Sequence, residues 1–211
     1  MKEYKLAENT VQKDDIDALC DWLKTYPKLT KGEQTDGFEK ELAEWTNRKY
    51  AVFCNSGSSA NLLMAFTLKW KIEQQPRKNN IVIVPDVGWA TTITPFIQAG
   101  FTPVMCPTDL DTFAMNLMEL ERLCQIHQPI GVIYVQPLGV LIDKDKILSL
   151  KKRYDFILME DACGAVGSSY ADGTKAGKVG DMSSWSLFYG HQISSGGCGG
   201  VVFTDDEQLW E

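Results

Sequence analysis

AVFCNSGSSANLLMAFTLKWKI (residues 51–72) joins a short apolar strand to an apolar helix through a turn of glycine and serine. Residues 51–55 include β-branched and aromatic side chains, which favour a strand, and residues 59–72 are long and apolar enough for a buried helix. Strand, tight turn and helix in this order form the repeating unit of α/β proteins. The stretch therefore predicts a sheet whose strands alternate with helices.

The same alternation continues along the chain. The pattern predicts strands at 51–55, 81–85, 102–106, 131–136, 156–161, 182–188 and 200–204, and helices at 59–72, 91–100, 116–124 and 143–153. Several of these strands are apolar throughout, which is typical of a parallel sheet covered by helices on both faces. The predicted fold class is therefore α/β, with a mostly parallel seven-stranded sheet over about residues 51–205. Two helices are expected upstream, over 14–25 and from about Asp36, where Asp36 and Glu39 fit a capping box.

Composition excludes several classes of function. A formal charge of −7 over 211 residues argues against binding to nucleic acid or to an anionic membrane. No apolar run approaches the roughly 18 residues that span a bilayer. The six cysteines form no CxxC pair, and no signal peptide is apparent, so a reducing cytoplasmic setting is expected. His127 and His191 are the only histidines and no ligand pattern accompanies them, so no metal site is expected.

The residues just after each strand are the candidate site, because ligands of open α/β sheets bind beyond the carboxyl ends of the strands. Gly57 and Ser58 open a helix, where free N–H groups and the helix dipole favour an anion; the alternative is a simple serine N-cap. Trp89 can stack on an aromatic ring or lie in the core. Asp161 follows Glu160 at the end of an apolar strand, where it can hold a ring nitrogen protonated.

The last candidates lie in SSWSLFYGHQISSGGCGGVVFT (residues 183–204), which contains Ser186, His191 and a glycine-rich loop. An imidazole at the mouth of such a loop can transfer protons or bind a metal, and the alternative is a surface hairpin with an incidental histidine. A phosphate cradle, a stacking aromatic residue, a strand-end aspartate and a polar turn are together the parts of a pyridoxal phosphate site.

Four segments, NSGSSANLLM, VPDVGWATT, MEDACGAVGSSY and GKVGDMSSWSLFYGHQIS, occur in the order and spacing of a known family. The chain resembles the DegT/DnrJ/EryC1/StrS sugar aminotransferase and dehydratase family from about Leu6 to Glu211. The resemblance implies a homodimer with the large domain of a type I aminotransferase over residues 1–211 and a pyridoxal or pyridoxamine 5′-phosphate cofactor. It also implies that the phosphate binds Gly57 and Ser58 with help from Ser186, that Trp89 stacks on the ring, and that Asp161 pairs with the ring nitrogen.

His191 stands where most members of that family carry the lysine that binds the cofactor covalently. The chain is most similar to a subgroup with histidine there, the 3-dehydratases of nucleotide-linked 4-keto-6-deoxy sugars. This implies deoxysugar biosynthesis for a surface polysaccharide such as lipopolysaccharide, with a nucleotide sugar as substrate, glutamate as an amino donor and His191 as the base. The alternatives are an aminotransferase-like enzyme using Lys175 or Lys178, and an inactive module for cofactor binding or dimerisation.

Two further positions depart from the resemblance. Gly164 replaces a polar residue, and Gly197-Cys198-Gly199 replaces a Glu-Gly-Gly run. Both changes are expected to weaken catalysis. The smaller C-terminal domain of the family is also expected to be absent from a chain that ends at Glu211.

Overall fold

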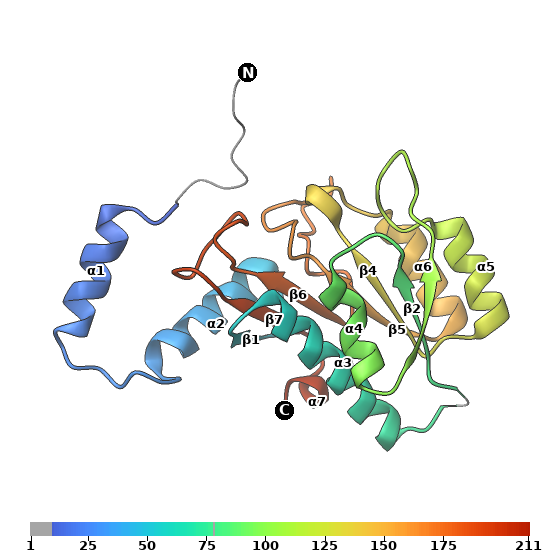
Figure 1. Ribbon diagram of the computed structural model, residues 1–211, viewed down its shortest axis with the longest axis horizontal. Helices are drawn as coiled ribbons and strands as arrows, with labels where there is room; N and C mark the ends of the chain where they lie inside the picture. The colour runs from blue at the N-terminus through green and yellow to red at the C-terminus, as the bar shows by residue number, and fades with distance from the viewer. Residues whose placement is uncertain (1–9, 78) are drawn as a thin grey trace.

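The computed structural model describes residues 10–77 and 79–211 and is built around one seven-stranded sheet (Figure 1). The strands are β1 (Tyr50–Cys54), β2 (Ile81–Pro85), β3 (Thr102–Cys106), β4 (Gly131–Val135), β5 (Ile157–Asp161), β6 (Met182–Ser186) and β7 (Gly200–Thr204). Their order across the sheet is β1-β7-β6-β5-β4-β2-β3. β7 runs antiparallel to both of its neighbours, and every other neighbouring pair is parallel. The prediction of a mostly parallel seven-stranded sheet is confirmed.

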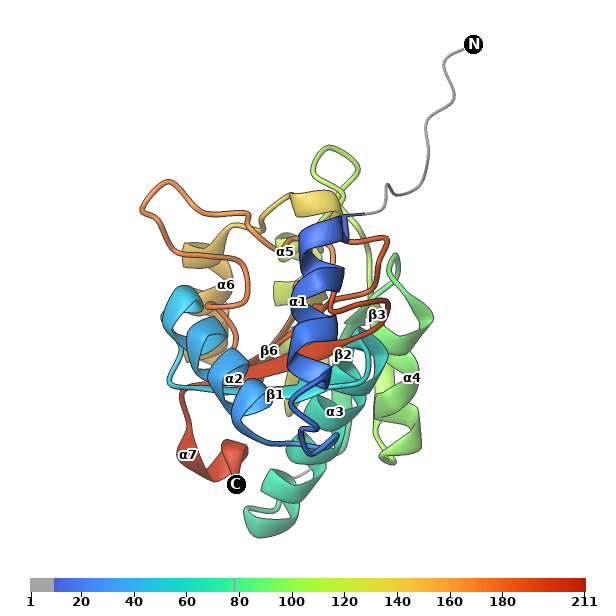
Figure 2. The same ribbon diagram turned by 90° about the vertical axis from the view of Figure 1, so that its left-hand side faces the viewer.

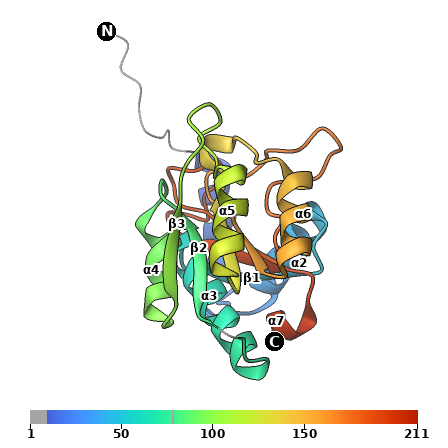
Figure 3. The ribbon, with the colours of Figure 1, turned by 90° about the vertical axis from the view of Figure 1, so that its right-hand side faces the viewer.

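Helices cover both faces of this sheet, as predicted (Figures 1 and 3). α3 and α4 pack on one face, and α2, α5 and α6 pack on the other. The helices are α1 (Lys13–Leu23), α2 (Glu33–Thr46), α3 (Gly57–Gln74), α4 (Ala90–Gln98), α5 (Leu117–His127), α6 (Lys144–Tyr154) and the short α7 (Glu207–Trp210). No helix in the described part of the chain is long and apolar enough to cross a membrane.

Two apolar layers hold the helices to the sheet. Met64, Leu68 and Phe96 of α3 and α4 are fully buried on one face, and Ile147 of α6 is fully buried on the other. Side chains alternate along a strand, so neighbours in β5 belong to different layers. Leu158 lies in the α5/α6 layer and Met159 in the α3/α4 layer. By the same alternation, Glu160 points to the α5/α6 face and Asp161 points to the α3/α4 face. This difference decides their roles at the site.

The first N-terminal helix agrees with its prediction and the second differs from it. α1 forms where it was predicted, but Ile16, Leu19 and Leu23 remain 49%, 48% and 41% exposed. The helix stands apart from the sheet in Figure 1 and lies in front of it in Figure 2. The predicted capping box at Asp36 is wrong, because α2 begins three residues earlier, at Glu33. The Glu39 carboxylate instead accepts the backbone N–H of Phe53 at 2.8 Å, so it fastens α2 to β1.

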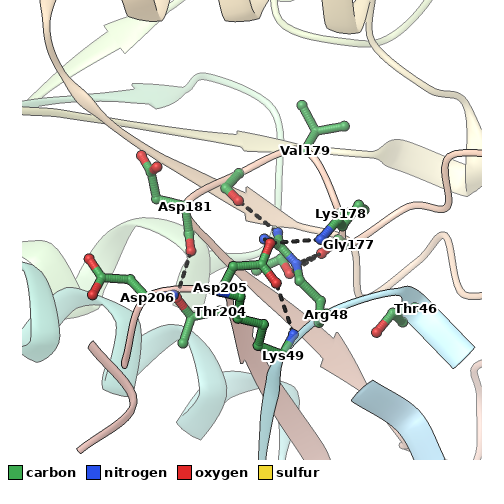
Figure 4. Close-up of polar contacts among 12 residues, drawn as sticks. Thr46, Arg48, Lys49, Gly177, Lys178, Val179, Asp181, Thr204, Asp205 and Asp206 are labelled. Atoms are coloured by element: carbon green, nitrogen blue, oxygen red, sulfur yellow. Dashed lines mark hydrogen bonds and ion pairs between the residues drawn. The ribbon is translucent and has the colours of Figure 1, made fainter. Parts of the chain in front are cut away.

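At the amino-terminal edge of the parallel strands, a buried arginine joins three segments (Figure 4). The side chain of Arg48 is 2% exposed, and its guanidinium donates to the carbonyl oxygens of Gly177 and Gly180 at 2.8 and 2.6 Å. It also pairs with the Asp205 carboxylate at 3.0 Å, and Lys178 pairs with the same carboxylate at 2.7 Å. The network ties the α2–β1 turn to the loop before β6 and to the end of β7, so it stabilises this edge of the sheet.

Arg48→Lys is expected to reduce the free energy of unfolding by about 2 kcal/mol. A single ammonium cannot reproduce the planar fork that reaches two carbonyl oxygens and a carboxylate together. Urea denaturation measures the change. Arg77→Lys is the control, because Arg77 pairs with the exposed Asp155 and its replacement is expected to cost less than about 0.5 kcal/mol. Equal losses of unfolding free energy in Arg48→Lys and Arg77→Lys would contradict the structural role of Arg48.

Candidate active site

The carboxyl ends of the parallel strands meet at the edge opposite Arg48. In the register of the sheet, Cys54 and Ser186 both lie beside Gly200, and Asp161 lies beside Ser184. Asp161 and Ser186 are the last residues of β5 and β6, and the segments after β1, β2 and β6 contain the other predicted site residues, which are Gly57, Ser58, Trp89 and His191. Two surface depressions of about 270 and 360 Å³ border Arg48 at the other edge, where its polar groups are already paired with protein.

The start of α3 is the predicted anion site. Ser56 is the N-cap, and its hydroxyl accepts the backbone N–H of Ser59 at 3.1 Å, so the simple N-cap is present as well. The N–H groups of Gly57 and Ser58 begin the helix and have no intrahelical acceptor. The hydroxyl of Thr91, in the first turn of α4, donates to that of Ser58 at 3.0 Å. Two helix N-termini therefore converge at one corner, where their dipoles favour a phosphate.

Glycine is required at two close contacts in this corner. A Cβ on Gly57 would lie 2.7 Å from the Cβ of Ser186 and 2.9 Å from the Sγ of Cys163. A Cβ on Gly200 would lie 2.1 Å from the carbonyl oxygen of Ser56. Real Cβ atoms do not approach other heavy atoms so closely, so the turn after β1 can sit on β6 and β7 only while these positions are glycine.

Asp161 is 4% exposed at the end of β5, on the face covered by α3 and α4. Its Oδ2 accepts the side-chain amide of Asn61 at 2.8 Å and the hydroxyl of Thr92 at 2.7 Å, and its Oδ1 accepts the N–H of Cys163 at 3.2 Å. The buried carboxylate is thus satisfied within the protein. Neither Asn61 nor Thr92 was predicted from the sequence, although an asparagine on the apolar face of residues 59–72 is a signal of a buried polar role.

Glu160 points to the other face of the sheet and has a structural role. Its carboxylate accepts the side-chain amide of Gln136 at 3.1 Å and the N–H groups of Gly177 and Val179 at 2.8 and 2.9 Å. These bonds hold the loop that also receives Arg48. Of the two adjacent carboxylates, only Asp161 faces the candidate site.

His191 lies half-buried in the turn after β6. Its backbone N–H donates to the carbonyl of Phe188 at 2.8 Å, and the two rings meet edge to face at 6.1 Å. Burial lowers the pKa of His191, and the Asp161 carboxylate opposes that shift by a smaller amount. The imidazole is therefore neutral at pH 7 and able to accept a proton.

Trp89 is the N-cap residue of α4 and is 75% exposed. The core alternative for Trp89 is therefore wrong, and its ring is free at the edge that carries Asp161. Gly164 has room for a side chain, since a Cβ there would come no closer than 3.7 Å to its neighbours. Gly197 has a φ of +138°, a conformation that favours glycine.

The alternative lysines lie elsewhere. The Nζ of Lys175 sits 3.6 Å from the ring centroid of Trp45, on α2. Lys178 pairs with Asp205 at the opposite edge of the sheet. Neither amine is placed beside Asp161. In the described residues, no group of three or more His, Cys, Asp or Glu side chains is arranged to hold a metal ion.

The His191 pKa is expected to lie below its ordinary value of about 6.5 and to fall further in Asp161→Asn. Removing the carboxylate removes the interaction that favours the imidazolium. An NMR titration of the imidazole resonances, assigned with His191→Gln, measures both values. The basic form is then fully present at neutral pH and is lost as the pH falls through the lowered pKa. A His191 pKa above 6.5, or one that rises in Asp161→Asn, would contradict this electrostatic account.

The fold recurs in known proteins. The chain is 32% identical over 212 residues to GDP-4-keto-6-deoxy-D-mannose 3-dehydratase of Yersinia pseudotuberculosis, covering 100% of this chain and 52% of that protein. It is 32% identical to a GDP-perosamine synthase of Caulobacter vibrioides over 82% of this chain and 44% of that protein. The solved structure of the Escherichia coli GDP-4-keto-6-deoxy-D-mannose-3-dehydratase with bound hydrated PLP superposes with a TM-score of 0.88 at 32% identity, covering 100% of this chain and 53% of that chain.

The chain thus spans about half the length of the curated relatives it matches. Its sheet and helices have the aminotransferase fold of these structures. The profile of the DegT/DnrJ/EryC1/StrS aminotransferase family matches residues 9–211, nearly the whole chain, and this protein is a member of that family.

Proposed function

We propose that this chain forms the cofactor-binding part of a pyridoxamine-phosphate-dependent 3-dehydratase that acts on a nucleotide-linked 4-keto-6-deoxy sugar. The observation that carries the proposal is an imidazole, that of His191, in the turn after β6 where the family resemblance calls for a lysine. Relatives named as GDP-4-keto-6-deoxy-D-mannose 3-dehydratases, from two bacteria at 32% identity, support the same class of reaction.

The residues present fit the cofactor. The converging starts of α3 and α4 suit its phosphate, with Gly57, Ser58 and Ser186 as the ligands. The exposed ring of Trp89 suits stacking on the pyridine, and the Asp161 carboxylate suits a protonated ring nitrogen. When bound, pyridoxamine phosphate supplies the amine that condenses with the 4-keto group and a ring that accepts electrons.

His191 would act as the base. In its neutral form the imidazole would be able to accept a proton from the C4′ position of a bound pyridoxamine phosphate. Burial favours that neutral form by lowering the pKa. Because imidazole is not a primary amine, His191 cannot hold the cofactor covalently, which suits a cofactor that must keep its own amine free.

The second candidate is a transaminase that uses another lysine, and the geometry weighs against it. The Lys175 amine lies over the ring of Trp45 and Lys178 pairs with Asp205, so neither amine lies by the candidate phosphate and ring sites.

An inactive module is supported by Gly164, which offers no side chain at a position where the resemblance implies a polar residue. The absence of saturable cofactor binding would favour the inactive module.

The proposal extends to partners and compartment. A homodimer, a nucleotide-sugar substrate and glutamate as amino donor follow from the dehydratase class. The six free cysteines support a reducing compartment such as the cytoplasm.

Asp161→Asn is expected to weaken binding of pyridoxal phosphate at least about tenfold, because it removes the charged acceptor for the ring nitrogen. Titration of the 211-residue chain, followed by cofactor absorbance, measures the dissociation constant. Asp172→Asn is the control, because Asp172 is an exposed carboxylate paired with Lys144. The proposal fails if the unmodified chain shows no saturable binding or if the two variants bind alike.

A further inference from the structure

The two oxygens of the Asp161 carboxylate are hydrogen-bonded to different extents. Both short side-chain bonds go to one oxygen, Oδ2, from the amide of Asn61 at 2.8 Å and the hydroxyl of Thr92 at 2.7 Å. Oδ1 accepts a longer bond of 3.2 Å from the backbone N–H of Cys163, and the Cys163 thiol also interacts with this carboxylate. A carboxylate oxygen can accept more than one hydrogen bond, so Oδ1 keeps capacity for a further donor.

A second hydroxyl fixes the orientation of Asn61. The Oγ of Ser184 donates to the Oδ1 of Asn61 at 2.6 Å, so the amide must turn its Nδ2 donor toward Asp161. Asn61, Thr92 and Ser184 are 2%, 0% and 0% exposed. They come from α3, α4 and β6, and therefore lock Asp161 of β5 against three other elements.

We propose that Asn61 and Thr92 are positioning residues that orient Asp161 toward the ring nitrogen of the cofactor, and that Ser184 fixes the orientation of the Asn61 amide. This inference rests on the proposed function, which places that ring nitrogen at Asp161. The carboxylate plane can rotate about its side-chain bonds, and two donors on Oδ2 remove that freedom. The free capacity of Oδ1 is then held at a fixed place for a charge-assisted bond from a protonated ring nitrogen.

The same two residues join the ring site to the phosphate site. Thr92 follows Thr91, whose hydroxyl bonds to Ser58, and Asn61 lies one turn after Gly57 on α3. The helix starts that are proposed to bind the phosphate therefore also carry Asn61 and Thr92, which orient the Asp161 carboxylate. The spacing between the proposed phosphate and ring sites is thereby set by α3 and α4.

The test uses pyridoxal phosphate labelled with ¹⁵N in the ring. Thr92→Val keeps the shape of the side chain and removes its donor, and it is expected to bind the cofactor about fivefold more weakly. The ¹⁵N resonance of the bound ring is expected to move toward the unprotonated position. Thr92→Ser keeps a hydroxyl and is expected to restore both readouts, and Asn61→Leu is expected to behave like Thr92→Val.

Ser183→Ala is the matched control. Ser183 is as buried as Ser184 and precedes it in β6, but it donates to the carbonyl of Gly177 on the other face of the sheet. Removing the Ser183 hydroxyl tests for general damage to the sheet and is expected to leave the ¹⁵N resonance of the bound ring unchanged. Heat denaturation without cofactor checks that each variant folds.

Three outcomes are distinguishable. Weaker binding and a shifted resonance in Thr92→Val, absent from Thr92→Ser and Ser183→Ala, would support the inference. Saturable binding by the unmodified chain with an unchanged resonance in Thr92→Val and Asn61→Leu would overturn the inference and leave the proposed function standing. No saturable binding by the unmodified chain would overturn both.

Discussion

Gly200→Ala is expected to lower the free energy of unfolding by about 3 kcal/mol or more. The new Cβ would lie 2.1 Å from the carbonyl oxygen of Ser56, 2.3 Å from its carbon and 2.7 Å from the backbone nitrogen of Gly57. All three are backbone atoms, so no side chain can rotate away to relieve the overlap. The turn between β1 and α3 must move off β7, and the start of α3 that forms the proposed phosphate site moves with it.

Urea denaturation and cofactor titration together measure this effect. Gly37→Ala is the matched control, because Gly37 lies inside α2 with no atom within 4 Å of a new Cβ. Alanine is the better helix former, so that change is expected to stabilise the protein by about 1 kcal/mol. If Gly200→Ala left stability and cofactor binding unaltered, the close contact between β7 and the Ser56–Gly57 turn would be refuted.

His191→Lys is expected to convert a protein that holds pyridoxal phosphate reversibly into one that can be trapped covalently. A lysine amine can condense with the aldehyde of the cofactor, and borohydride reduction makes that bond permanent. Neutral imidazole cannot form such a bond. The expected change is from no adduct at position 191 to about one per chain, provided that the turn after β6 faces the cofactor carbon.

Peptide mass spectrometry locates the adduct. His127→Lys is the control, because His127 ends α5 on the other face of the sheet and is not expected to meet the cofactor. Adducts of similar yield at both positions would indicate random labelling of surface amines. The absence of an adduct at position 191 would show that the turn does not bring this residue to the cofactor.

The arrangement of the sheet follows closely from local sequence. Short apolar strands separated by helices predict a mostly parallel sheet, and each of the seven strands forms within a few residues of its expected range. The strand-end rule then gathers Gly57, Ser186 and Asp161 at one edge without any knowledge of the strand order. The capping box predicted at Asp36 does not form. The Glu39 carboxylate instead accepts the backbone N–H of Phe53, which is a contact between separate elements.

Other parts of the site need tertiary information. FILMED shows two adjacent carboxylates, but only the register of β5 shows that Glu160 faces the Arg48 loop and Asp161 faces α3. Thr92 is separated from Asp161 by 69 positions, so no local pattern joins them. The sequence left Trp89 open between core and site, and its exposure is set by its place at the start of α4.

The central claim is that His191 occupies the place of a covalent lysine in a site that binds the cofactor without a covalent bond. The most direct test saturates the unmodified chain with pyridoxal phosphate, treats it with borohydride, and measures the denatured protein by mass spectrometry. We predict that about one cofactor binds per chain and that the denatured protein carries no pyridoxyl adduct. A stoichiometric adduct on Lys175, Lys178 or any other lysine would contradict the account.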